Sequence, residues 1–309
     1  MYKASLSILK VITYFNVFNY PVRKEEIISF LDAEYSIQEI NEALDYLLEK
    51  EIIFQFEDYY SLQNNYAWIT RRKEGNEKAI GQLSIAGKVA GLLAKFPYVR
   101  GVAVSGSLSK HFADENADID FFIITAKNRL WVARTIMHLF KKLTFLTGRQ
   151  HWYCMNYYVD ETALEIKEKN IYTATEIVTA LPMHGEEVFR DFFSANTWIK
   201  NFFPHYVSEK NDCKKISKEI FKTTGEYLLN NKLGDWLDNF FMKITARRWQ
   251  KKTEQKRINS NGILMGMDAG KHYSKPVPGH LQEKVAIRFN LKMEQLIKEL
   301  EAIPTASVV

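Results

Sequence analysis

Cysteine is almost missing from this chain of 309 residues, which contains only Cys154 and Cys213. Two cysteines build neither a disulfide framework nor a four-cysteine zinc site, so both kinds of protein are excluded. None of the seven histidines has a metal-binding spacing, and His151 near Cys154 is a lone pair without further ligands. A reducing compartment is the simplest interpretation, and we expect a cytoplasmic protein.

Long hydrophobic runs are missing as well. No segment reaches the roughly 18 uncharged apolar residues that a membrane span needs. The stretch from Met1 to Tyr20 carries Lys3 and Lys10 among its apolar residues and has no small-residue cleavage signal. We therefore predict a helix there, not a signal peptide, and no membrane partner.

The chain also lacks low-complexity segments and a dominant charge of one sign. Its formal net charge is +5 at pH 7, and the lysines and arginines are dispersed. This balance permits a polyanionic partner, nucleotide or RNA, without requiring one. With 46% hydrophobic and 14% aromatic residues, the chain is too apolar to be disordered. Its length predicts about two or three packed units.

Residues 1–65 show the pattern of three helices followed by a hairpin. Ser36 and Glu39 form a capping box at the start of the third helix. The helices are predicted at 5–18, 25–31 and 37–48, and the strands at 52–56 and 59–62. We predict a winged-helix-like module. Glutamates and aspartates outnumber Lys50 on and beside the third helix, so phosphates would repel it and a packing or dimerisation role is favoured over duplex DNA.

Residues 66–170 alternate between helical and strand-like patterns. The predicted elements are a helix at 71–96 within a linker at 66–97, strands at 98–104, 119–125 and 151–159, and a helix from Asn128, its cap, to about 146. Residues 171–309 are predicted to be mainly helical, with a polar loop at 261–279. The fold class is α+β: a small mixed sheet flanked by helices, with the N-terminal module and a helical C-terminal region.

The most informative segment places Gly106-Ser107 after a valine-rich strand and Asp118-Ile119-Asp120 before an apolar one. Residues i and i+2 of a strand face the same side, so the two carboxylates are expected side by side. Two adjacent anions favour a cation between them, and Mg²⁺ prefers oxygen ligands. Gly106 permits a sharp turn, and Ser107 offers a hydroxyl and amide groups to a phosphate.

This pattern resembles the signature of the DNA polymerase β-like nucleotidyltransferases. The resemblance is strong over residues 98–125 and extends more weakly to Arg129-Leu130-Trp131 and Arg134, which look like a helix start in bacterial members with an N-terminal winged helix. It implies transfer of a nucleoside monophosphate from a nucleoside triphosphate with two Mg²⁺ ions, for which Mn²⁺ can substitute. It implies catalytic and metal-binding roles for Asp118 and Asp120.

The resemblance also implies that Gly106 and Ser107 bind the triphosphate, and Lys110 stands where related enzymes often place a basic residue. Arg129, near the start of the next helix, is a candidate to neutralise phosphate. The family's third carboxylate is missing, because the strand at 151–159 offers only Asn156. A neutral metal ligand and a structural hydrogen-bonding residue are both open for Asn156. Glu161 and Glu165 lie just beyond.

Two basic segments complete the set of candidates. Arg247 to Arg257 is the most basic run and contains Trp249, a combination that suits RNA, although the solvated end of a helix is the commoner case. Lys271, His272 and Lys275 cluster in the predicted C-terminal loop, either as a contact to phosphate or acceptor or as ordinary solvated side chains.

The predicted function is Mg²⁺-dependent transfer of a nucleotidyl group to an acceptor that the sequence does not identify: RNA, a protein or a small molecule. Two alternatives come from other classes. One is a non-catalytic nucleotide-binding or regulatory protein on the same fold, which the missing carboxylate favours. The other is a winged-helix transcription regulator with a sensor domain, which the acidic third helix opposes.

Overall fold

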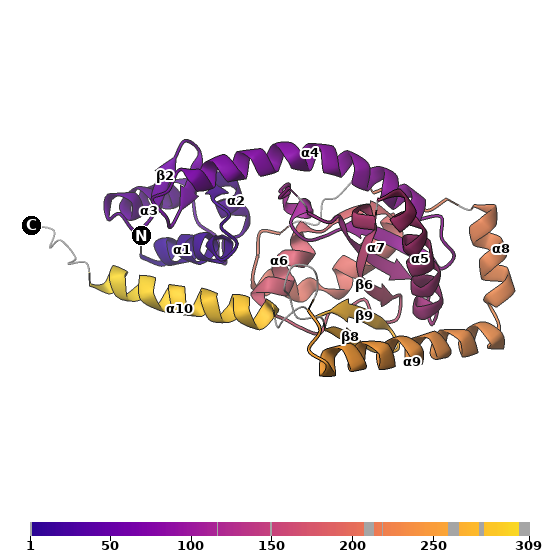
Figure 1. Ribbon diagram of the computed structural model, residues 1–309. Helices are drawn as coiled ribbons and strands as arrows, with labels where there is room; N and C mark the ends of the chain where they lie inside the picture. Colours follow the sequence, from indigo (N-terminus) through magenta and orange to yellow (C-terminus); the bar gives the residue numbers. More distant parts are fainter. Residues whose placement is uncertain are drawn as a thin grey trace, which may run out of the picture.

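The computed structural model describes residues 2–115, 117–148, 150–206, 213–217, 219–258, 266–277 and 281–302. The protein combines helices with a three-stranded and a six-stranded sheet, so the α+β prediction is confirmed. The long helix α4 (Ala67–Leu93) runs from the N-terminal module across the body that holds the larger sheet (Figure 1). None of the helices in the described ranges combines the length and apolar character of a membrane span.

The N-terminal module contains three helices and a small antiparallel sheet of order β1-β3-β2. Its elements are α1 (Tyr2–Asn16), β1 (Val22–Arg23), α2 (Lys24–Ser29), α3 (Ile37–Glu49), β2 (Phe54–Phe56) and β3 (Tyr59–Ser61). The capping box is confirmed, since Ser36 Oγ accepts from the Glu39 amide at 3.2 Å and the Glu39 carboxylate accepts from the Ser36 amide at 2.8 Å. The two-residue strand β1 was not predicted, because it is too short to show alternation.

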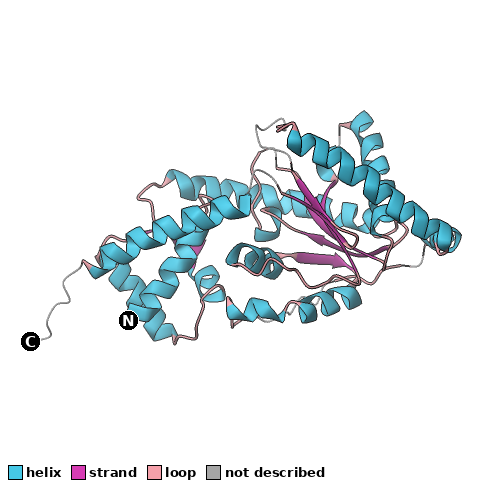
Figure 2. Cartoon of the chain, turned by 90° about the horizontal axis from the view of Figure 1, so that it is seen from below, coloured by secondary structure: helices cyan, strands magenta, loops and turns pink. Residues whose placement is uncertain are grey.

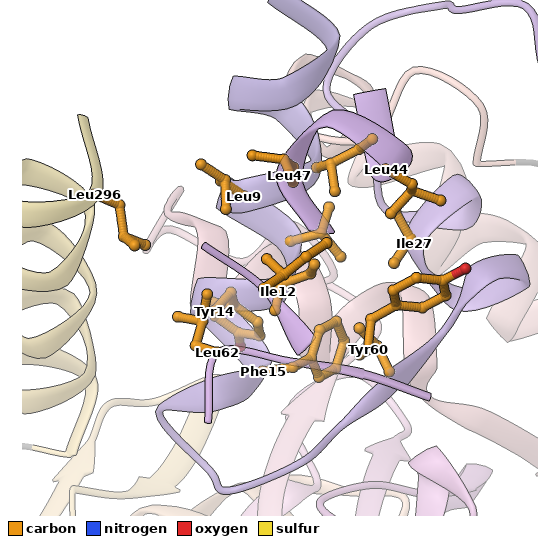
Figure 3. Close-up of a cluster of buried hydrophobic side chains, with 14 of the residues drawn as sticks. Leu9, Ile12, Tyr14, Phe15, Ile27, Leu44, Leu47, Tyr60, Leu62 and Leu296 are labelled. Atoms are coloured by element: carbon orange, nitrogen blue, oxygen red, sulfur yellow. The ribbon is translucent and has the colours of Figure 1, made fainter. Parts of the chain in front are cut away.

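The C-terminal helix α10 (Leu281–Glu301) completes the core of this module. Figure 3 shows Leu296 of α10 facing the apolar side chains of α1 and α3, among them Leu9 and Leu47. Phe289 of α10 also packs edge-on against Tyr14, with ring centroids 6.4 Å apart. The hydrophobic core of the module is therefore built from both ends of the chain.

The six-stranded sheet has the order β7-β4-β5-β6-β9-β8, and only the pair β5 and β6 is parallel. Its strands are β4 (Val99–Val104), β5 (Asp120–Thr125), β6 (Cys154–Asp160), β7 (Leu181–His184), β8 (Met267–Ala269) and β9 (Tyr273–Pro276). The strands β4, β5 and β6 were predicted. The other three belong to the region predicted as mainly helical, and β8 and β9 replace part of the predicted loop. The sheet therefore extends across the boundary placed at residue 170.

Helices cover both faces of this sheet (Figure 2). Phe121 and Ile123 of β5 pack with α4 and α5, whereas Phe122 and Ile124 pack with α6 and α7. The remaining helices and 3-10 segments are α5 (Leu130–Thr144), α6 (Ile171–Thr179), α7 (Glu186–Ala195), α8 (Ile220–Leu229), α9 (Lys232–Glu254), η1 (Leu108–Lys110), η2 (Phe145–Thr147), η3 (Gln150–Trp152) and η4 (Thr197–Asn201). Residues 121–124 of β5 are all apolar, as expected for a strand that is covered on both faces.

The predicted cap of α5 is wrong. The helix begins at Leu130, and Asn128 has a positive φ of 56° and makes no cap. Instead, Asp238 of α9 accepts from the amides of Trp131 at 2.8 Å and Val132 at 3.0 Å. The capping carboxylate is far away in the sequence, so a search for local capping patterns cannot find it.

Candidate functional site

The turn after β4 touches the start of β5. The Ser105 amide donates to the Asp120 carbonyl at 2.9 Å, which holds the turn against the strand. Gly106 adopts φ +70°, and a Cβ atom at this position would lie 2.8 Å from Asp120 Oδ2. Glycine is favoured here, because other residues rarely adopt this φ and a Cβ atom would force the Asp120 carboxylate to move. The structure thus brings the Gly106 turn and Asp120 into contact.

Ser107 follows the turn and is exposed at the start of η1, a single 3-10 turn. Its hydroxyl makes no capping hydrogen bond. Lys110, at the end of η1, donates to the Gly106 carbonyl at 3.0 Å and to Glu176 Oε1 of α6 at 2.7 Å. Its ammonium group therefore links α6 to the turn through contacts within the protein.

The two aspartates differ in their surroundings. Asp118 precedes β5 and is 44% exposed, and its Oδ1 lies 2.6 Å from His151 Nδ1. Asp120 is half-buried at the start of β5, where loss of solvent raises the pKa of its carboxyl to about 7, helped by the nearby negative charges of Asp118 and Glu176. When it is ionised, a carboxylate whose pKa is raised in this way carries a negative charge that its surroundings do not balance. A cation at this position would stabilise it.

Asn156 reaches this pair from the neighbouring strand. Its Nδ2 donates to Asp120 Oδ1 at 2.5 Å, while Cys154 Sγ lies 3.3 Å from Asn156 Oδ1. The pairing of β5 with β6 shifts between Phe121 and Phe122. Phe121 lies opposite Met155 and Phe122 opposite Tyr157, so no residue of β5 lies opposite Asn156. Such a bulge changes the direction of a side chain, and bulges are common beside active sites. The structure places Asn156 where the missing third carboxylate was expected.

Arg129 is not part of this arrangement. It is 6% exposed and its Nη1 binds Asp235 of α9 at 2.6 Å. Asp120 is the first residue of β5, and Arg129 comes after the last one. The six residues of that strand span roughly 20 Å. The expected contact of Arg129 with the nucleotide is therefore not supported, because the strand separates them and a carboxylate already pairs with the guanidinium group.

A cavity of about 470 Å³ opens beside Asp120 on the α6 side of the sheet. Its walls come from β5, β6, β9, α6, α7 and the start of α10, and Gly106 and Asn156 lie at its edge. Its charged lining residues are Asp120, Glu168, Glu176, Asp268, Lys275 and Glu283. Apart from Asp120, only Lys275 was singled out in the sequence. The others lie far apart along the chain, and only the packing of α6, the β8-β9 hairpin and α10 brings them together.

Lys275 lies on β9, not in a loop, and is 9% exposed. Its Nζ pairs with Glu168 and lies 3.4 Å from Asp268. His272 binds the buried Asp160 through Nδ1 at 2.8 Å. Both side chains therefore hold the hairpin to the body. Glu161 accepts from the Lys127 amide and Glu165 pairs with Lys169, and neither lines the cavity.

The side chains around Asp120 offer oxygen atoms of the kind that bind magnesium. Asp118 and Asp120 supply carboxylate oxygens, and rotation of the Asn156 amide would present its oxygen, which together are ligands that Mg²⁺ prefers. The unbalanced charge of Asp120 favours a cation. In the part of the chain that the structure describes, no cluster of three or more His, Cys, Asp or Glu side chains is arranged to hold a metal ion.

Comparisons of the chain with protein family models, curated proteins and solved structures find no match. The resemblance to the polymerase β-like nucleotidyltransferases therefore rests on the motif over residues 98–125.

Proposed function

We propose that the protein is a Mg²⁺-dependent nucleotidyltransferase of the polymerase β-like type. The observation that supports this most is the contact between the Gly106 turn and Asp120, next to Asp118 and a large cavity. A mixed sheet flanked by helices is compatible with the nucleotidyltransferase fold. The three helices and the β1-β3-β2 sheet of residues 1–65 support a winged-helix-like module.

Each residue of the motif has a role in this proposal. The exposed Ser107 hydroxyl and the amides of the Gly106-Ser107 turn bind the triphosphate. Asp118, Asp120 and Asn156 would hold Mg²⁺, or Mn²⁺ in its place. The bound ion would neutralise charge on the phosphates and on the reacting oxygens. Lys110 keeps the turn in position through its contacts with Gly106 and Glu176.

The proposed reaction is an in-line displacement at the α-phosphorus. A bond forms between an acceptor oxygen and the α-phosphorus, and the bond from the α-phosphorus to the bridging oxygen breaks. Pyrophosphate leaves with that electron pair, and the proton of the acceptor hydroxyl passes to water. The protein contributes mainly position and charge, which is what phosphoryl transfer requires.

Asn156 favours a second candidate function. It stands at the place of the third carboxylate and donates its amide to Asp120. A site with one carboxylate fewer can retain a nucleotide without turning it over, and this would make the protein a nucleotide-binding regulator. The acidic α3 opposes the transcription regulator, because Glu39, Glu42 and Glu49 are exposed.

The proposal is tested by measuring pyrophosphate release from each of the four ribonucleoside triphosphates, with Mg²⁺, over RNA, protein and small-molecule acceptors. We expect release with at least one acceptor, its loss in EDTA and its recovery when Mg²⁺ is restored in excess. Nucleotide binding that depends on Mg²⁺ but gives no pyrophosphate would support the regulator instead. No nucleotide binding in any condition would overturn both candidates.

Mg²⁺ affinity is expected to fall as the pH drops below about 7. Burial raises the pKa of Asp120 to about 7, so the metal-free carboxyl is protonated below this pH and the ion must displace the proton. Each further pH unit should raise the Mg²⁺ dissociation constant about tenfold, which calorimetric titration between about pH 5.5 and 8 would measure. Asp120→Asn should show no such dependence, and a constant wild-type affinity would contradict the prediction.

A further inference from the structure

The N-terminal module contacts the segment that follows the Gly106-Ser107 turn. Tyr20 lies in the loop between α1 and β1, and its hydroxyl donates to the Lys110 carbonyl at the end of η1, at 2.8 Å. The Tyr20 ring also packs edge-on against Phe112, with ring centroids 5.8 Å apart. Phe112 belongs to the hydrophobic core of the module, although it lies between β4 and β5 in the sequence. The module therefore holds this segment through one hydrogen bond and one buried ring.

Tyr20 is itself held firmly in place. It is 7% exposed, and the Arg72 guanidinium group of α4 lies over its ring, 3.7 Å from the centroid. Arg72 in turn pairs with Glu26 Oε1 of α2 at 2.8 Å. The Tyr20 hydroxyl lies 3.1 Å from the same Glu26 oxygen, so the Lys110 carbonyl is the nearer of its two acceptors. Burial raises the pKa of this hydroxyl, which therefore keeps its proton and remains a donor.

Helix α4 contacts the same segment from another direction. The Ala113 amide donates to the Gly75 carbonyl of α4 at 3.1 Å. A Cβ atom at Gly75 would overlap the Phe112 ring, so glycine lets this ring lie against the helix. Because α4 begins at the module and continues over the body, it ties residues 107–113 to the module as well (Figure 1).

Contacts inside η1 carry this position to the turn. Ser109 Oγ and Lys110 Nζ both donate to the Gly106 carbonyl, at 2.8 and 3.0 Å. The Lys110 amide donates to the Ser107 carbonyl at 3.0 Å. A single 3-10 turn of three residues is weakly held by its own hydrogen bonds, because their geometry is poor. Contacts from outside, of which Tyr20 provides one, therefore decide where Gly106 and Ser107 lie.

We propose that the N-terminal module fixes the Gly106-Ser107 turn and thereby sets how tightly the site holds a triphosphate, with Tyr20 as the positioning residue. A turn that is ordered before binding loses less conformational freedom when the phosphates arrive, and this raises affinity. The inference rests on the proposed function, which makes a triphosphate the ligand of this turn. It gives the module a role that needs no contact of α3 with DNA.

The test compares two variants that each lose one phenolic hydroxyl from the module. Tyr20→Phe keeps the ring and its packing but removes the donor to Lys110. Tyr59→Phe is the matched control, because the Tyr59 hydroxyl accepts from Arg23 Nη2 at 2.7 Å, inside the module. A general loss of stability in the module would affect both variants, whereas a change in the turn would affect only the first.

Two measurements are made on each protein. Titration calorimetry gives the affinity for each of the four ribonucleoside triphosphates and for inorganic tripolyphosphate in the presence of Mg²⁺, and for Mg²⁺ alone. Hydrogen exchange of the amides of residues 107–113 reports on the order of the turn without any nucleotide.

Tyr20→Phe should weaken the binding of the nucleotide and of tripolyphosphate about three- to tenfold, within the range of one net hydrogen bond. Affinity for Mg²⁺ alone should keep its wild-type value, because the proposed metal ligands lie on and beside β5 and β6. The amides of residues 107–113 should exchange faster in this variant. Tyr59→Phe should change none of these quantities. Both variants should melt within about 4 °C of wild type, because each loses a single hydrogen bond.

Wild-type triphosphate affinity in Tyr20→Phe, or equal weakening in both variants, would overturn the inference and leave the proposed function intact. If the wild-type protein bound no triphosphate, the proposed function would fail instead. Faster exchange of residues 107–113 in Tyr20→Phe alone would then retain Tyr20 as the residue that positions the turn, and unchanged exchange would remove that role too.

Discussion

Asp120→Asn is expected to lower kcat/KM for nucleotidyl transfer by about a thousandfold, the scale seen when one preorganised charge-stabilising group is removed. Asparagine has nearly the same shape as aspartate and keeps one side-chain oxygen, which can still accept from Asn156. The Gly106 turn keeps its partner as well, because the Ser105 amide donates to the backbone carbonyl of residue 120. The change removes the negative charge beside Asp118 that would hold Mg²⁺. Initial rates of pyrophosphate release over a range of nucleotide concentrations give kcat/KM, and Mg²⁺ titration measures the loss of the metal.

Asp114→Asn is the matched control for this variant. Asp114 lies in the same connection between β4 and β5, is 60% exposed and pairs with Arg71 at 2.8 Å. An exposed pair of this kind contributes little to stability, so activity and folding should remain near wild type. If Asp120→Asn kept wild-type transfer, Asp120 would not be a metal ligand. If both variants lost activity equally, the effect would be on folding.

Leu296→Ala is expected to lower the free energy of unfolding by about 2–5 kcal/mol, as for other buried leucines. Leu296 is 2% exposed and packs into the core formed by α1 and α3, although it comes from the opposite end of the chain. The truncation leaves a cavity between α10 and the N-terminal module. Chemical denaturation followed by tryptophan fluorescence and circular dichroism would measure the loss.

Leu291→Ala provides the comparison on the same helix. Leu291 is 62% exposed, so its truncation removes little buried apolar surface and should change stability by less than about 0.5 kcal/mol. A similar loss for both variants would mean that the contact of Leu296 with α1 and α3 is not the origin of the effect. An unchanged Leu296→Ala protein would contradict the packing of α10 on the module.

Local patterns predicted the parts of the structure whose causes are local. The capping box at Ser36 is a contact between residues three apart, and the structure contains both of its hydrogen bonds. The strands β4 and β5 are apolar runs bounded by the Gly106 turn and Asp120, so their existence follows from composition and spacing. The proximity of Gly106 to Asp120 comes from the tertiary structure, because it depends on the antiparallel pairing of β4 with β5.

Predictions that depended on distant packing were less successful. Arg129 was expected near phosphate, but its partner is Asp235, which lies more than a hundred residues away. The helix cap assigned to Asn128 belongs to Asp238 for the same reason. The strands β7, β8 and β9 contain three or four residues each, too few for alternation to distinguish them from loops.

The sequence by itself determined an α+β chain with a glycine turn and two aspartates at the edge of an apolar strand, because these features arise from residue type and short spacing. Only the tertiary structure decided what surrounds the aspartates. The β-bulge that directs Asn156 to Asp120, the ion pair of Lys110 with Glu176 and the cavity lined by Glu168 and Asp268 all join separate segments of the chain. Such contacts depend on how helices and strands pack, which no local pattern encodes.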